Sequence, residues 1–326
     1  MGDDPVDGWT LGPDDREQAA GRVLALVLGA DLATFRSHEP GVRGDADPES
    51  LHQFRVSLRR ARSLLAVGGA VFPEEELVLL RALSAWMAEA TSPVRDLDVL
   101  LDELPRLGER IVPELVDGFV GLAASLEDAR EESFSALIGA LDDDRHPVLL
   151  RRWTVMSSVY RVGGGEPGPD ARRPAGEVVD GLLMQSWKRM RRRGRTAMRT
   201  DDRESWHDLR KAIKRFRYLV SAFEPMYPDG SFDRVLDGLS GLQDVLGGLQ
   251  DHHVQASIVE SVGVAEGGRA ALAAGVVADS LHRDAEAAHA ECCDAWSDFD
   301  RPKLRRRVLA VVSAAGATTR TTARSG

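Results

Sequence analysis

Residues 51–64 read LHQFRVSLRRARSL, and residues 206–219 read WHDLRKAIKRFRYL. The two stretches align without a gap, so that His52 corresponds to His207 at an offset of 155 residues. The same offset pairs further identical residues outside both stretches, among them Arg36 with Arg191 and Pro73 with Pro228. A match this long indicates an internal duplication, which has to be considered before any single element.

The duplication divides the 326-residue chain into two halves that we expect to fold alike. We assign residues 11–161 to the first half and residues 175–315 to the second. A Gly/Pro-rich linker, residues 162–174, separates them. We expect residues 1–10 and the Thr-, Ala- and Arg-rich tail 316–326 to be disordered.

The composition limits the class of protein. Hydrophobic residues make up 43% of the chain, which is enough for a core in each half. The net charge is −10, so an anion would have to bind through a concentrated basic patch. No apolar run approaches the length of a membrane span, and we expect a cytoplasmic protein. Adjacent Cys292 and Cys293 do not bridge each other readily and by themselves are not a metal site.

Apolar residues recur with the period of an α-helix in nearly every segment, and no alternating pattern indicates a strand. The sequence therefore predicts an all-α fold of two helical bundles. Asp47-Pro48-Glu49-Ser50 is typical of a helix start, and Pro73 and Pro228 mark the ends of the repeated helices. We expect further helices at about 75–91, 113–141, 231–247 and 266–297, and a shorter one after Pro147 and after Pro302.

The repeated helix has one basic and one apolar face. At 100° per residue, the basic side chains of each copy fall within an arc of about 80°. The apolar side chains lie opposite and are expected to face the core. The basic arcs contain His52, Arg55, Arg59 and Arg62 in the first copy and His207, Arg210, Lys214 and Arg217 in the second, flanked by Arg60, Lys211 and Arg215.

A charged helix face is usually a solvated surface, but such surfaces mix both signs. This arc is entirely positive, recurs in an acidic chain, and so favours an anion site. Guanidinium groups bind two phosphate oxygens at once and stay charged. The arc spans about 15 Å, which suits several phosphates in a row. Neighbouring cations should hold its histidine neutral until a polyanion raises the pKa.

The two motifs, together with Arg95-Asp96-Leu97-Asp98, Gln250-Asp251 and Ser37-His38-Glu39-Pro40, resemble the CHAD family, the conserved-histidine α-helical domain. The resemblance covers about residues 13–315. It implies two helical bundles related by a pseudo-twofold axis around a basic groove or pore. It also implies binding of inorganic polyphosphate and association with polyphosphate granules. Some members carry a triphosphate-tunnel hydrolase domain, and no segment of this sequence resembles it, so hydrolysis is not expected.

The resemblance also implies which residues bind the polyanion. Arg36 and Arg191 occupy matching positions and are expected at the rim. Lys188, Arg192, Arg195, Arg306 and Arg307 are weaker candidates. The expected polyphosphate-binding set is His52, Arg55, Arg59, Arg60, Arg62, His207, Arg210, Lys211, Lys214, Arg215, Arg217, Arg36 and Arg191.

Other readings of these residues stay open. Asp96 with Asp98, and Asp251 with His252 and His253, could bind a metal, but we expect Asp96 and Asp251 to cap helices or orient an arginine. We therefore expect no metal, no cofactor and no catalytic residue.

An enzyme remains the alternative, either a phosphohydrolase or a His-phosphotransfer module acting on polyphosphate or related phosphorylated ligands. His207-Asp208 invites comparison with HD-type hydrolases, but the first copy reads His52-Gln53. Nucleic acid is not expected, because single-strand readers place aromatic residues among the cations and the basic arc has none. We expect inorganic polyphosphate and granule proteins as partners, and no membrane.

Overall fold

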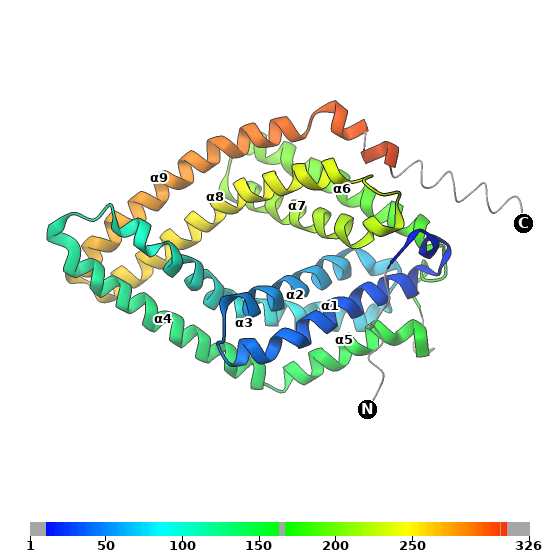
Figure 1. The fold of residues 1–326 in the computed structure, drawn as a ribbon, viewed down its shortest axis with the longest axis horizontal. Helices are drawn as coiled ribbons and strands as arrows, with labels where there is room; N and C mark the ends of the chain where they lie inside the picture. Colours follow the sequence, from blue (N-terminus) through cyan, green and yellow to red (C-terminus); the bar gives the residue numbers. More distant parts are fainter. Residues whose placement is uncertain (1–10, 163–166, 307, 312–326) are drawn as a thin grey trace, which may run out of the picture.

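The computed structural model describes residues 11–162, 167–306 and 308–311 (Figure 1). This part of the chain is helical and contains no strand, only an isolated bridge between Ala19 and Pro174. The predicted all-α class is confirmed. None of its helices is both long and apolar enough to cross a lipid bilayer. The predicted tail 316–326, residues 1–10 and part of the predicted linker lie outside the described residues.

The long helices form two groups that face each other across the molecule (Figure 1). The first group comprises α1 (Ala20–Arg43), α2 (Pro48–Val67), α3 (Glu74–Gly108), α4 (Val116–Asp142) and α5 (Arg145–Val162). The second group comprises α6 (Ala175–Thr200), α7 (Arg203–Phe223), α8 (Asp233–Glu266) and α9 (Gly268–Phe299). The domain boundaries given above stay predictions.

The repeated basic helices α2 and α7 begin in the same way. Asp47 is the N-cap of α2, and its carboxylate accepts the backbone N–H of Ser50 at 2.8 Å. Asp202 caps α7 and accepts the backbone N–H of Ser205, also at 2.8 Å. Each cap satisfies one of the free N–H groups of a first helical turn. The helix start predicted at Asp47 is confirmed.

The third helix of each half is longer than predicted. We expected ends near residues 91 and 247, but α3 continues to Gly108 and α8 to Glu266. Pro93 and Pro105 lie inside α3, although each removes a backbone hydrogen bond. Packing offsets this cost, since the extensions bury a second apolar cluster that includes Leu97, Leu100, Leu104 and Leu107 of α3 and Ala256 and Val259 of α8.

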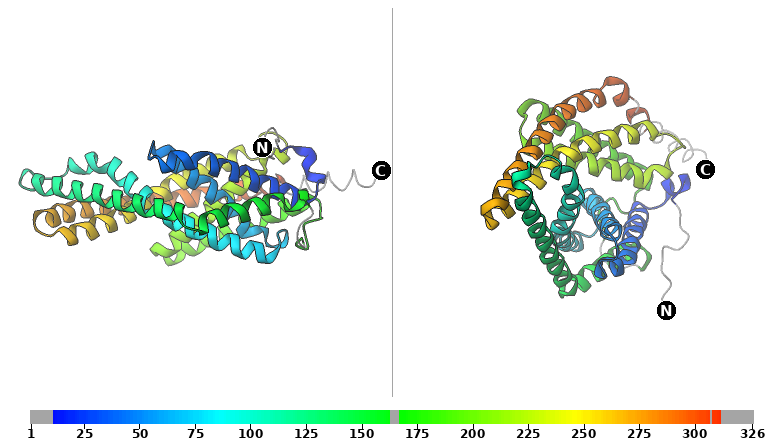
Figure 2. Two further views of the ribbon diagram at one scale, coloured as in Figure 1. Left: turned by 90° about the horizontal axis from the view of Figure 1, so that it is seen from below. Right: turned by 60° about the vertical axis from the view of Figure 1, so that its left-hand side comes forward.

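These extensions give the molecule its elongated form. The distal parts of α3 and α8 pack with α4 and α9 into a tip at one end of the molecule, beyond α1, α2, α6 and α7 (Figures 1 and 2). A separate main core lies under α1, α2, α6 and α7 and contains residues of both halves. The tip is thus built on its own apolar cluster, and the basic helices lie on the main core.

A buried ion pair joins the start of the chain to the second half. Arg16, in the 3-10 helix Pro13–Glu17, contacts Asp180 of α6 at 2.8 Å. The Tyr227 hydroxyl donates to the same carboxylate at 2.6 Å, and the Arg16 guanidinium lies 4.9 Å from the centre of the Tyr227 ring. The side chains of Arg16 and Asp180 are only 10% and 13% exposed.

We expect Arg16→Ala to lower the free energy of unfolding by about 3 kcal/mol, because it leaves the Asp180 carboxylate buried without its charged partner. Arg173→Ala is the matched control. Arg173 also pairs with two carboxylates, but its side chain is 49% exposed, and its loss should cost less than about 1 kcal/mol. Urea denaturation measures both. Equal losses in the two variants would contradict a structural role for the buried pair.

Candidate functional site

Helices α2 and α7 come from different halves of the chain and contact each other. Their apolar faces lie in the core as the helical wheel predicts. Phe54, Leu58, Ala61 and Leu65 of α2 are buried, as are Leu209, Ile213, Phe216 and Val220 of α7. This packing fixes the direction of the basic side chains on the other side of each helix.

A cavity of about 210 Å³ lies between α2 and α7, and side chains of α3 and α8 complete its walls. Positive groups dominate its lining, because five arginine or lysine side chains and one histidine accompany only two aspartates. We call it the central cavity. It is lined by His52, Arg55 and Arg59 of α2, Arg95, Asp96 and Val99 of α3, Arg210 and Lys214 of α7, and Asp251, Val254 and Gln255 of α8.

Hydrogen bonds from α3 and α8 hold some of these cations in place. Arg55 donates to the hydroxyls of Thr91 and Ser92 at 2.9 and 3.2 Å. Arg210 donates to the Asp251 carboxylate at 3.1 Å, in agreement with the expected orienting role of that aspartate. Burial raises the pKa of Asp96, although Arg55 opposes the shift.

Other donors in the central cavity have no partner. The buried Nε atoms of Arg59 and Arg210 lack a hydrogen bond within the described part of the chain. The Arg59 guanidinium also lies 5.8 Å from the centre of the Tyr218 ring. Buried polar groups are normally hydrogen-bonded, so these two N–H groups are unusual in being unpaired within the described residues.

The cations in the cavity disfavour one another's charge. Burial, together with the charges of nearby Arg210 and Arg59, lowers the pKa of Lys214 to about 7 against the opposing effect of Asp251. Burial likewise lowers the pKa of Arg55 to about 10, with Asp96 opposing and Arg59 adding to the shift. An anion bound among these groups would remove the repulsion.

Both histidines have lowered pKa values, as the sequence predicts, but burial is the first cause. For His52 the charges of Arg95, Arg59 and Arg55 add to the effect of burial, while Glu49 opposes it. For His207 the hydrogen bond between Nδ1 and Gln250, at 2.9 Å, opposes it. His207 lines a neighbouring cavity of about 310 Å³ that also contacts Arg210. The two histidines therefore border different cavities.

We expect Lys214→Met to stabilise the unliganded protein at pH 6 by about 2 kcal/mol. The folded-state pKa of Lys214 is about 7, against an ordinary value of 10.5, so between these values only the unfolded chain carries the proton. Native stability therefore rises with pH across this window, and the advantage of the methionine should shrink from pH 7 to pH 10.5.

Urea denaturation at pH 6, 8 and 10 measures this effect. Lys188→Met, which removes a lysine from an exposed position of α6, is the control. An advantage of Lys214→Met that does not change with pH would contradict the account of the cavity.

The basic arcs continue beyond the central cavity. Arg62 and Arg215 are close enough that the charge of Arg62 lowers the pKa of Arg215, after burial and the charge of Arg189. Arg81 contributes to the same shift and donates its Nε to the Leu65 carbonyl at 3.0 Å. A second positive cluster, formed by Arg62, Arg81, Arg189 and Arg215, thus lies further along α2 and α7.

The structure places the remaining candidates elsewhere. Each lies near an acidic or polar side chain that does not line the central cavity. Arg60 lies near buried Asp31, whose pKa rises to about 8 through burial against the effect of Arg60. The other contacts are Arg217 with Gln243 at 2.9 Å, Lys211 with Asp208 at 2.7 Å, Arg36 with Thr154 at 2.9 Å and Arg191 with Asp300 at 3.1 Å.

Sequence reasoning missed several residues of the central cavity. Arg95 adjoins Asp96 in the quoted motif, and this position was a usable signal. Gln255 and Val254 are polar and apolar residues of an ordinary helix, and no sequence signal marks them. Asp98, considered as a metal ligand, instead accepts a hydrogen bond from Arg130 at 3.0 Å.

Comparison with known proteins identifies similar chains. A family model described as the CHAD domain matches residues 26–260. Two Mycobacterium tuberculosis proteins, Rv2226 of strain ATCC 25618 / H37Rv and MT2285 of strain CDC 1551 / Oshkosh, are each 27% identical to the chain over 238 residues. The matched region is 64% of this chain but only 39% of either relative, so the chain spans well under half of their length.

Solved structures share the arrangement of helices. The crystal structure of the CHAD domain from the plant Ricinus communis has a TM-score of 0.66 and 23% identity, with coverage of 94% of this chain and 96% of that one. PptA from Streptomyces chartreusis has a TM-score of 0.61 and 18% identity, with coverage of 86% and 99%. At these identities the likeness is one of fold.

Proposed function

Because the chain belongs to the CHAD domain family, we propose that it binds inorganic polyphosphate without processing it. One observation carries the proposal: α2 and α7 contribute four arginine and lysine side chains, and α3 a fifth, to one cavity whose lining has only two aspartates. A linear polyanion with a charge on every unit matches such a lining. The resemblance of the sequence motifs to this family implies the same ligand, and it implies association with polyphosphate granules.

The extent of the positive surface favours a chain over a single phosphate. The central cavity has a volume of about 210 Å³, and the second positive cluster lies further along the same pair of helices. A chain that leaves the cavity along α2 and α7 would contact both groups. Each further phosphate then adds contacts without a new cost of association, which raises the affinity for long chains.

Binding is favoured over catalysis by the groups that face the ligand. Arginines dominate the lining of the central cavity, and they cannot act as general acids or bases at neutral pH. His52 and Lys214 are the exceptions among the basic groups, because burial and the neighbouring cations lower both pKa values, that of Lys214 to about 7. The enzyme alternative is therefore tested separately. Nucleic acid is a poorer match, because no aromatic residue lines the cavity to stack on a base.

Calorimetric titration tests the proposal directly. We expect long-chain polyphosphate to bind on the order of 100-fold more tightly than pyrophosphate, because many phosphates engage one rigid surface. Equal affinities for the two ligands would contradict polyphosphate as the cognate class.

The enzyme alternative has its own test. The protein is incubated with polyphosphate and Mg²⁺ or Mn²⁺, and released phosphate and phosphohistidine are measured. We expect neither product. Turnover that disappears in His52→Ala or His207→Ala would replace the binding function with catalysis.

A further inference from the structure

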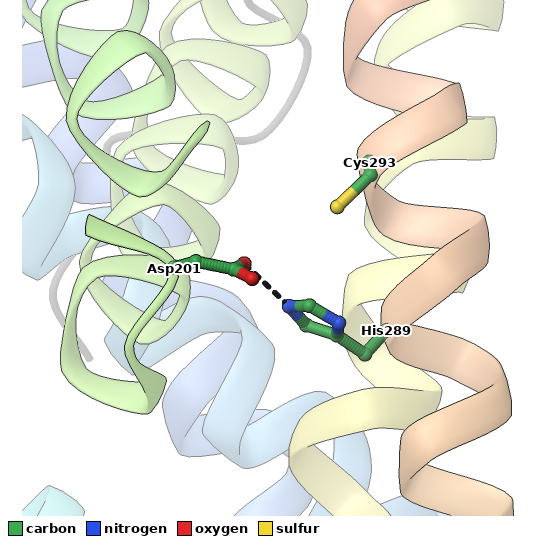
Figure 3. Close-up of side chains that lie close together, drawn as sticks. All are labelled: Asp201, His289 and Cys293. Atoms are coloured by element: carbon green, nitrogen blue, oxygen red, sulfur yellow. Dashed lines mark hydrogen bonds and ion pairs between the residues drawn. The ribbon is translucent and has the colours of Figure 1, made fainter. Parts of the chain in front are cut away.

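A group of potential metal ligands lies on the second half, away from the central cavity. The carboxylate of Asp201, the imidazole of His289 and the thiol of Cys293 each offer one donor atom, and these atoms all lie within 4.8 Å of one another. Figure 3 shows the three side chains converging on one point between the end of α6 and the face of α9. His289 and Cys293 lie on the same helix, α9, whereas Asp201 precedes His289 by 88 positions in the sequence.

Local structure holds each donor in position. Asp201 directly follows α6 in the left-handed conformation, with φ of 53°, and its Oδ1 accepts the Trp206 indole N–H at 3.1 Å. The same oxygen lies 2.8 Å from His289 Nε2. The His289 ring packs edge-on against Trp206, with ring centres 5.5 Å apart. Cys293 follows His289 by one helical turn, so that both side chains project from one face of α9.

The three donors are not a product of the duplication. At the offset of 155, positions 201, 289 and 293 correspond to Ala46, Phe134 and Ile138, none of which binds a metal. Ion pairing alone would explain the contact between Asp201 and His289, but it does not explain a thiol at the same point. Thiolate, imidazole and carboxylate are all ligands that transition metals accept.

We propose that Asp201, His289 and Cys293 bind a zinc ion. Thiolate and imidazole ligands favour Zn²⁺ over Ca²⁺ or Mg²⁺, which require several oxygen ligands. Tetrahedral zinc places neighbouring donor atoms about 3.3–3.8 Å apart, so the donors need shifts of about 1 Å or less. The imidazole and the carboxylate separate slightly, and the ion replaces the hydrogen bond between them.

Three protein ligands leave a fourth coordination position. Asp201 and His289 also line the 310 Å³ cavity that contains His207 and His253. The side chains of Asp201 and His289 are 57% and 32% exposed, so an ion can reach them from solvent. A water molecule from this cavity completes the coordination, as in three-ligand zinc sites. The proposal is independent of polyphosphate binding, since none of the three ligands lines the central cavity.

Cobalt substitution tests the site in the full-length chain. The protein is stripped of metal with a chelator and titrated with Co²⁺, which reports thiolate ligation by a charge-transfer band in the near ultraviolet. We expect one equivalent to produce the band and excess Zn²⁺ to abolish it. Cys293→Ser should eliminate the band, and His289→Ala should weaken Co²⁺ binding at least about tenfold.

Two variants are matched controls. Cys292→Ala removes the adjacent, buried thiol, and His282→Ala removes a histidine of the same helix that pairs with Glu260 instead. Both should retain the band. Zn²⁺ should also raise the melting temperature of the native chain and of the two controls, but not that of Cys293→Ser. This melting transition also shows that each variant is folded. No band in the native chain, or a band that persists in Cys293→Ser, would overturn the site.

Discussion

Replacing Lys214 by Glu is expected to weaken polyphosphate binding at least about 100-fold, and replacing Arg59 by Glu should do the same. Each change turns an attraction into a repulsion inside a partly buried cavity. At an effective dielectric constant of about 20, one unit charge about 5 Å from a phosphate contributes about 3 kcal/mol. A reversal changes the charge by two units, but solvent screening reduces the net loss of binding free energy to about the same 3 kcal/mol. Lys214 lies on α7 and Arg59 on α2. A loss of affinity in both variants would therefore show that the two helices share one binding site.

Arg269→Glu provides the control for these reversals. It makes the same change in net charge at the start of α9, in the tip, where the side chain is 65% exposed. Its effect on affinity should be less than about threefold. The unliganded Lys214→Glu protein should remain folded, because the new carboxylate lies near Arg210, Arg59 and Arg55. A reversal in one half with no effect on affinity would show that the two halves bind separately.

Salt is expected to weaken binding by about 50- to 150-fold between 50 and 200 mM. The estimate assumes four phosphate contacts, from Arg55, Arg59, Arg210 and Lys214, each with the counterion release measured for nucleic acids. Arg59→Gln removes one contact and should lower the slope of log affinity against log salt by about one. Fluorescence anisotropy with labelled polyphosphate measures both slopes. A salt-independent affinity would contradict a site built on ion pairing.

The sequence predicted which residues form the basic faces of α2 and α7 better than it predicted which of these residues share one cavity. Helical periodicity placed Phe54 and Ile213 in the core and the cations opposite them, because packing of the apolar face fixes the rotation of a helix. It could not show that Arg60 and Arg217 lie outside the central cavity. The wheel describes one isolated helix, whereas the position of a flanking residue depends on which neighbouring helix covers it.

The lengths of α3 and α8 show a second limit. The sequence placed the ends of these helices near residues 91 and 247, close to Pro93 and Gly247-Gly248, which are unfavourable inside a helix. Burial of the tip residues outweighed that preference, and the extended helices supply Arg95, Asp96 and Asp251 to the cavity. Such contacts depend on tertiary packing between segments about 155 residues apart, which local sequence patterns do not contain.

The structure of the protein bound to polyphosphate of defined length tests the central claim most directly. We expect one continuous anion in the central cavity, with phosphate oxygens in contact with Arg55 and Arg59 of α2 and with Arg210 and Lys214 of α7. The buried Nε atoms of Arg59 and Arg210, unpartnered within the described residues, should then each have a phosphate partner. An anion that contacts only one of the two helices, or that lies outside the central cavity, would contradict a binding site shared by the two halves.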